Sequence, residues 1–108
     1  MEVGEIYTFS GFISVEGDEI VGIIVSEDYA KEQRIAQGED TESDWAGRGT
    51  ARRHRNRKWA IVIKTSDEGA WARGRVYSVD NSWERVEQIM DEDVKRRYMK
   101  MAFLECGE

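Results

Sequence analysis

The sequence predicts an α+β fold: a small antiparallel β-sheet, or an SH3-like, partly closed barrel, with helices toward the C-terminal end. Several short runs alternate apolar and polar residues with a period of two, which is typical of strands. Two later stretches change to helical spacing, and strands and helices do not alternate as regular β-α-β units. With 108 residues, 40% of them hydrophobic, the chain is long enough for one domain, 1–108, and too short for two.

The first predicted strand covers residues 5–15. Tyr7, Phe9, Ile13 and Val15 fall on one side of this run and polar residues on the other, as in a half-buried strand. Gly11 interrupts the pattern, which indicates a bend or a bulge.

A hairpin and a helix are predicted next. Gly17 and Asp18 separate two strand-like runs, and glycine at the first loop position suits a two-residue type II′ turn. The returning run, residues 20–25, is apolar on both faces, which is typical of a central strand. A helix should follow from its N-cap Ser26 to about Gln37, ending at Gly38.

Residues 38–57 carry many charges and glycines and no apolar periodicity, so the sequence predicts a long, mobile, charged loop there. A third strand is predicted over residues 58–65, where tryptophan and isoleucines alternate with smaller or charged residues. A fourth is predicted over residues 71–79, with four large side chains sharing one face: Trp71, Arg73, Arg75 and Tyr77.

Two helices are predicted to close the chain. Asn81 and Glu84 have the spacing of a capping box, ahead of apolar residues at helical intervals from Trp83 to Met90. Asp91 can cap a second helix, whose apolar residues are Val94, Tyr98, Met101 and Ala102.

Charge is distributed very unevenly along this chain of net charge −6. Residues 1–44 carry a net charge of −10, residues 45–75 of +7 and residues 76–108 of −3. A positive middle third between two acidic ones indicates either an anionic partner or internal pairing between the thirds. For internal pairing, the nearest acidic residues are Glu39, Asp40, Glu42 and Asp44.

The candidate binding residues combine arginine with aromatic side chains. The guanidinium fork matches phosphate and carboxylate groups, and Trp or Tyr rings can stack on unpaired bases. Ten residues supply these groups in the basic loop and on the fourth strand: Arg48, Arg52, Arg53, Arg55, Arg57, Lys58, Trp71, Arg73, Arg75 and Tyr77. The partner that they indicate is a nucleic acid or an acidic protein surface.

Motifs for other chemistry are missing from the sequence. The single Cys106 has no partner for a disulfide, and with His54 as the only histidine no zinc site or Ser-His-Asp arrangement is expected. No phosphate-binding loop or dinucleotide fingerprint occurs, so we expect no cofactor and no metal. No apolar run reaches the roughly 20 residues that span a bilayer, and the N-terminus lacks a signal-peptide pattern, so we expect a cytoplasmic protein without a membrane partner.

Four stretches resemble the PemK/MazF group in order and spacing: "VGEIYTF", "EIVGIIVSEDYA", "AIVIKTS" and "GRVYSVDNSWERV" with the helix after it. The resemblance implies an SH3-like barrel and a metal-free endoribonuclease of the toxin type. The group's threonine at the end of the third strand is matched by Thr65. Its catalytic arginine, ahead of the second strand, falls at Asp18–Ile20 and is not matched; Arg73 or Arg75 would have to substitute for it, with His54 nearby.

Three functions therefore stay open, and with them the question of whether the chain is an enzyme. The first is a non-catalytic module that docks an anionic partner through the basic loop and the strand face. The second is the metal-free ribonuclease, with Thr65, His54 and Arg73 around the phosphate. The third is a phage-type inhibitor whose acidic outer thirds cover the nucleic-acid-binding surface of a host protein. A homodimer is compatible with each.

Overall fold

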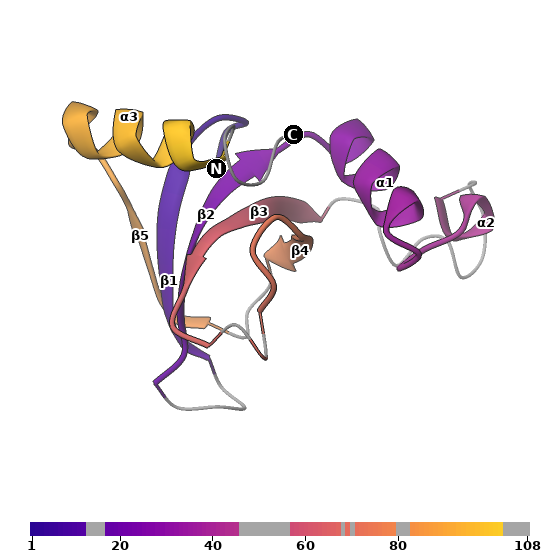
Figure 1. The fold of residues 1–108 in the computed structure, drawn as a ribbon, viewed down its shortest axis with the longest axis horizontal. Coiled ribbons are helices and arrows are strands. Elements are labelled where there is room, and N and C mark those ends of the chain that lie inside the picture. Colours follow the sequence, from indigo (N-terminus) through magenta and orange to yellow (C-terminus); the bar gives the residue numbers. More distant parts are fainter. Residues whose placement is uncertain (13–16, 46–56, 68, 70, 80–82, 103–108) are drawn as a thin grey trace.

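Five strands form one antiparallel sheet in the order β4-β3-β2-β1-β5 (Figure 1). The computed structural model describes residues 1–12, 17–45, 57–67, 69, 71–79 and 83–102. Within these ranges the edge strands β4 and β5 do not pair with each other, so the α+β class is confirmed as an open sheet and not as a closed barrel. The strands are β1 (Ile6–Phe12), β2 (Glu19–Val25), β3 (Lys58–Thr65), β4 (Val76–Val79) and β5 (Trp83–Gln88).

The first hairpin contains both predicted strands with a different register; Ile13 and Val15 of the first one lie outside the described residues. Ser10 lies opposite Glu19, and the amide of Gly11 donates to the carbonyl of Asp18 at 3.2 Å. The chain therefore does not reverse in a two-residue turn at Gly17 and Asp18, and that prediction is wrong. Gly11 has a φ of +71°, which permits the predicted bend where β1 meets β5.

Strand β2 is central, as its apolar pattern predicts. It pairs with β1 on one side and β3 on the other, and its residues from Ile20 to Ile24 are buried. The pairing with β3 shifts between Val21 and Gly22. A side chain at Gly22 would press on Ala60, because its Cβ would lie 3.1 Å from the Cβ of that residue.

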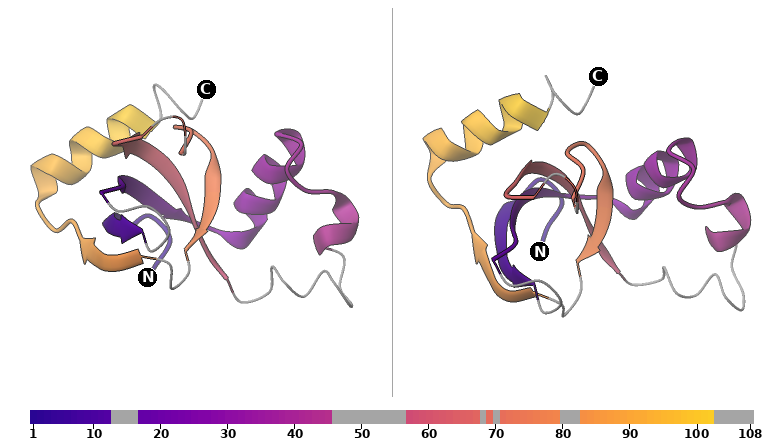
Figure 2. Two further views of the ribbon diagram at one scale, coloured as in Figure 1. Left: turned by 90° about the horizontal axis from the view of Figure 1, so that it is seen from below. Right: turned by 60° about the horizontal axis from the view of Figure 1, so that its bottom comes forward.

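The described residues contain three helices, and Figure 2 shows them toward the two edges of the sheet. Helix α1 (Glu27–Ala36) contacts β3 and β4, and its N-cap is Ser26, whose hydroxyl accepts from the amide of Tyr29. Gly38 follows its C-cap with a φ of +78°, so the predicted helix and its stop are confirmed. Helix α3 (Glu92–Met101), capped by Asp91 as predicted, lies on the β5 side.

The predicted loop at 38–57 differs from expectation in its first part. Residues Glu42–Trp45 form a short helix, α2, and Asp40 is buried at 6% exposure. This part is ordered by contacts of polar and aromatic side chains, which a search for apolar periodicity does not detect. Residues 46–56 lie outside the described residues.

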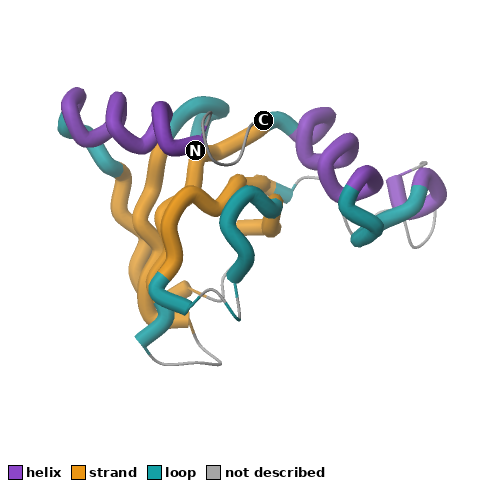
Figure 3. Tube along the Cα trace, in the orientation of Figure 1, coloured by secondary structure: helices purple, strands orange, loops and turns teal. Residues whose placement is uncertain are grey.

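Two predicted elements of the C-terminal half differ from the structure: the predicted strand 71–79 is a strand only over Val76–Val79, and the predicted helix that begins near Trp83 is a strand over Trp83–Gln88. Residues 71–75 are not strand: the amide of Arg75 donates to the carbonyl of Ala72 in a turn where Gly74 has a φ of +86°. Figure 3 draws the described residues between β3 and β4 as loop and turn. Residues 83–88 form β5 in place of a helix, paired with β1, and Glu84 lies in this strand; Asn81 lies outside the described residues.

The two faces of the sheet bury separate apolar clusters. Trp59, Ile61 and Ile63 of β3 alternate with Ala60 and Val62, so the strand contributes to both. One face packs against α1 and α3 through Ala30, Tyr29, Tyr98, Met99 and Ala102. The other holds Phe9, Ile20, Ile24 and Trp83 and is packed by aromatic rings from the loops and the edge strands.

Candidate anion-binding surface

The basic segment comprises residues 48–58, and the structure describes Arg57 and Lys58 at its end. Both residues are exposed, and the Nη1 of Arg57 donates to the hydroxyl of Ser78 on β4 at 3.3 Å. Both line a cavity of about 370 Å³, whose other walls come from the N-terminal residues Met1–Val3 and from the end of β2 and the start of α1. The other predicted basic residues, together with His54, lie outside the described residues: Arg48, Arg52, Arg53 and Arg55.

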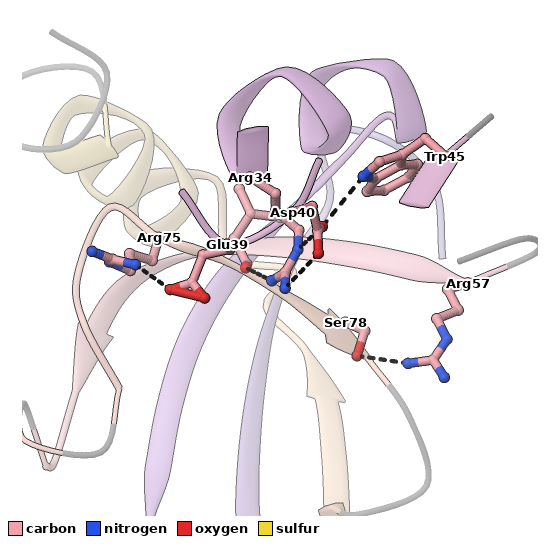
Figure 4. Close-up of polar contacts among 8 residues, drawn as sticks. Arg34, Glu39, Asp40, Trp45, Arg57, Arg75 and Ser78 are labelled. Atoms are coloured by element: carbon pink, nitrogen blue, oxygen red, sulfur yellow. Dashed lines mark hydrogen bonds and ion pairs between the residues drawn. The ribbon is translucent and has the colours of Figure 1, made fainter. Parts of the chain in front are cut away.

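Strand β4 begins beside a second basic group. Arg75, one residue before the strand, forms an ion pair with Glu39, and both side chains are partly exposed, at 40% and 43%. Figure 4 shows Arg75 and Arg57 toward the two ends of this short strand, with Arg34 between them. The Nη1 of Arg34 donates to the backbone carbonyl of Val76 at 3.1 Å. Three arginines from distant parts of the sequence therefore lie along one edge strand.

Arg34 also joins α1 to the segment that leads into α2. It forms an ion pair with Asp40 and lies over the ring of Trp59, with the guanidinium carbon 5.3 Å from the ring centroid. The indole nitrogen of Trp45 donates to Asp40 at 3.3 Å, and the rings of Trp45 and Trp59 are 5.4 Å apart. These contacts explain why residues 38–45 pack against the sheet although their sequence is polar.

Three of the acidic residues ahead of the basic segment form ion pairs with cations in the described part of the chain. Glu39 pairs with Arg75, Asp40 with Arg34, and Glu42 with Lys31 at 3.2 Å. None of these three cations belongs to the basic segment, residues 48–58. The side chain of Asp44 is outside the described part of the chain.

The predicted face of Trp71, Arg73, Arg75 and Tyr77 does not exist as a strand face, because only Tyr77 lies in β4. The indole of Trp71 donates to the buried carboxylate of Asp18 at 2.8 Å, and its ring lies 5.1 Å from that of Tyr77. The hydroxyl of Tyr77 accepts from the amide of Ala72 at 3.1 Å. Arg73 is exposed at the turn.

Trp71 belongs to an aromatic cluster on the face of the sheet that the helices leave uncovered. Its ring centroid is 5.0 Å from that of Phe12 and 5.1 Å from that of Trp83, and Phe12 and Trp83 are 4.8 Å apart. Such tilted and edge-to-face pairs stabilise a packed cluster. Trp71 and Tyr77 therefore pack within this cluster, and both side chains are partly exposed.

Thr65 lies apart from the arginine row, the three arginines Arg34, Arg57 and Arg75 along β4. Its hydroxyl accepts from the amide of Asp67 at 3.1 Å and donates to the carbonyl of the same residue at 3.2 Å, which closes the turn after β3. Thr65 and Lys64 line a cavity of about 260 Å³ together with Tyr98, Glu19 and other polar residues. Arg73 and Arg75 are not among the described residues that line it.

A carboxylate near the N-terminus has a shifted pKa. The Oε1 of Glu5 accepts from the backbone amide of Glu2 at 2.7 Å and from the hydroxyl of Tyr7 at 2.8 Å. These bonds favour the charged form and lower the pKa of Glu5 below its ordinary value of 4.5. The same carboxylate raises the pKa of Tyr7 above its ordinary value of 10.0, because a charged acceptor holds the phenolic proton.

Two further searches of the described residues bear on function. They contain no group of three or more His, Cys, Asp or Glu side chains placed to hold a metal ion. No helix among them is both long enough and apolar enough to span a bilayer.

Comparisons with known protein families, with characterised proteins and with solved structures found no match to this chain.

Proposed function

We propose that this chain is a non-catalytic binding module that docks an anionic partner through its basic segment, residues 48–58. The observation that carries the proposal is the pairing of the neighbouring acidic residues. Of the four acidic residues nearest to the basic segment, Glu39, Asp40 and Glu42 each form an ion pair with a described cation outside it.

The described end of the segment is suited to such a partner. Arg57 and Lys58 are exposed side by side at the rim of a cavity, at the point where the chain enters the sheet. Because β3 is a buried, paired strand on both sides, it holds the backbone of these residues in place. Fixed cations lose less freedom on binding than cations on an unsupported chain.

A salt titration tests the proposal. Replacing Arg55, Arg57 and Lys58 by glutamine should weaken binding about tenfold or more at low salt, roughly 1.4 kcal/mol, and should flatten the dependence on salt. The probes are a labelled single-stranded oligouridylate and a labelled oligoglutamate peptide, measured by fluorescence anisotropy.

Helix α3 offers a matched control for this experiment. Replacing Arg96, Arg97 and Lys100 by glutamine removes the same charge from the β5 side of the sheet, away from the arginine row. We expect a much smaller loss of affinity from this variant, because screening limits the reach of a charge to about 8–10 Å at ordinary salt. Equal losses in the two variants, or binding that does not respond to salt, would argue against the proposal.

The ribonuclease remains a second candidate because Thr65 lines a polar cavity together with the cation Lys64. The hydrogen bonds of its hydroxyl within the turn count against a catalytic role. The oligouridylate of the first experiment also reports cleavage, which gel electrophoresis would detect. Cleavage that is lost on replacing Thr65 by valine would favour the ribonuclease over the binding module.

A further inference from the structure

Glu39 and Asp40 are consecutive residues, and each pairs with an arginine of the row along β4. Arg75 precedes the strand, Arg34 reaches Val76, and Arg57 reaches Ser78 (Figure 4). Because a strand rises about 3.3 Å per residue, positions 75 to 78 span only about 10 Å. A short acidic stretch of the chain therefore already lies on a compact basic surface.

The two carboxylates differ in how firmly they are held. The side chain of Asp40 is 1% exposed, and it receives hydrogen bonds from both Arg34 and Trp45. Glu39 is 43% exposed, and its ion pair with Arg75 is open to solvent. An exposed pair of this kind adds little to stability and is screened by salt, so another anion can take the place of the glutamate.

We propose that Glu39 is an internal competitor for Arg75, and that the partner which displaces it is an acidic peptide segment. This inference rests on the proposed function, since Arg57 belongs both to the basic segment and to the three arginines along β4. While Asp40 keeps the chain anchored, the Glu39 side chain leaves Arg75 and a carboxylate of the partner replaces it. Arg75 and the exposed Arg57 then bind the partner together.

The structure favours a peptide over a nucleic acid for two reasons. The arginine fork at this position already accepts a carboxylate from an irregular peptide stretch, which is the group that an acidic peptide presents. The aromatic rings that would stack on bases, Trp71 and Tyr77, pack against each other at 5.1 Å instead.

The experiment compares Glu39→Gln with Glu42→Gln in the full chain, with the labelled oligoglutamate as probe. Both variants remove one negative charge from the same stretch, but Glu42 pairs with Lys31 and not with an arginine of the row. We expect Glu39→Gln to bind about two- to fivefold more tightly than wild type, the fold-change that corresponds to an exposed ion pair. The gain from Glu42→Gln should be clearly smaller.

A double-mutant cycle identifies the contact responsible. In an Arg75→Ala background the gain in affinity from Glu39→Gln should disappear, because Glu39 no longer has an arginine to pair with at position 75. Thermal unfolding checks that each variant is folded, and we expect nearly unchanged midpoints for Glu39→Gln and Glu42→Gln.

Each other outcome counts against a stated part of the inference. Equal gains from Glu39→Gln and Glu42→Gln, or a gain that persists without Arg75, would overturn the competitor role while leaving the binding module intact. A gain seen with the oligouridylate but not with the oligoglutamate would overturn the acidic peptide as partner. Absence of binding by every variant to both probes would remove the proposed function and this inference together.

Discussion

Arg34 and Asp40 form an ion pair that is almost closed to solvent, with side-chain exposures of 18% and 1%. The pair connects α1 to the stretch before α2, and Arg34 extends it to β4 through the carbonyl of Val76. Since the Val76 carbonyl belongs to an edge strand, this hydrogen bond also occupies a backbone acceptor that a second chain could otherwise use. One side chain thus positions a helix, a loop and a sheet edge.

Replacing Asp40 by alanine should lower the free energy of unfolding by about 3 kcal/mol, because it leaves Arg34 largely buried without its carboxylate. Urea denaturation followed by far-UV circular dichroism measures the loss. Glu42→Ala is the control: its pair with Lys31 is exposed, and its loss should cost less than about 1 kcal/mol. Similar losses for the two variants would show that burial of the Arg34–Asp40 pair is unimportant.

Replacing Asp18 by alanine should cost about 1–3 kcal/mol, because the indole N–H of Trp71 loses its acceptor. The measurement is urea denaturation monitored by tryptophan fluorescence. Trp71→Phe should be destabilising as well, and the double variant should lose less than the sum of the two single losses. Strictly additive losses would contradict an energetic link between Asp18 and Trp71.

The stability of the fold should depend on Glu5 at mildly acidic pH. Its folded pKa is lowered, so its charged form stabilises the fold above the unfolded value of 4.5, and this contribution is lost as the pH falls through the folded pKa. Wild type should therefore be more stable than Glu5→Gln at neutral pH, with the difference shrinking below about pH 4.5. Urea titrations at a series of pH values test this, and a constant difference would contradict it.

Replacing Gly22 by alanine should destabilise the fold by about 1–3 kcal/mol through overpacking. Its Cβ would lie 3.1 Å from the Cβ of Ala60 and 3.3 Å from the carbonyl of Ile61 on the neighbouring strand. Thermal denaturation measures the effect. The compensating change Ala60→Gly removes the closer of the two contacts, so the double variant should be less destabilised than a sum of the single effects predicts; a full sum would argue against the steric cause.

Local pattern was sufficient for the first three strands and for two helices. The alternation in β1 and β3, the continuous apolar run of β2, and the caps Ser26 and Asp91 all predict the elements that the structure contains. These signals are local because each reflects a repeating contact with one buried face or a hydrogen bond within one turn.

The local sequence pattern predicted the wrong secondary structure where contacts with residues distant in sequence decide the conformation. Only Trp83 is buried in β5, and the five residues after it are exposed, so this edge strand has no alternation to detect. Trp83 and Val86 of β5 and Ile89 just after it have helical spacing, but pairing with β1 makes residues 83–88 a strand. Residues 71–75 alternate like a strand, yet the hydrogen bond from Trp71 to Asp18 and the turn at Gly74 hold them as a loop.

The sequence by itself determined the α+β class, the central place of β2, both main helices and the concentration of positive charge before β3. It also identified Arg57, Lys58 and Arg75 as candidate binding residues. Tertiary structure alone decided that Trp71 and Tyr77 pack within the protein and that Glu39 pairs with Arg75. The physical reason is distance along the chain. Ion pairs and ring contacts between residues about 5 to 70 positions apart depend on how the strands and loops meet in space, and the local periodicity of the sequence does not encode those contacts.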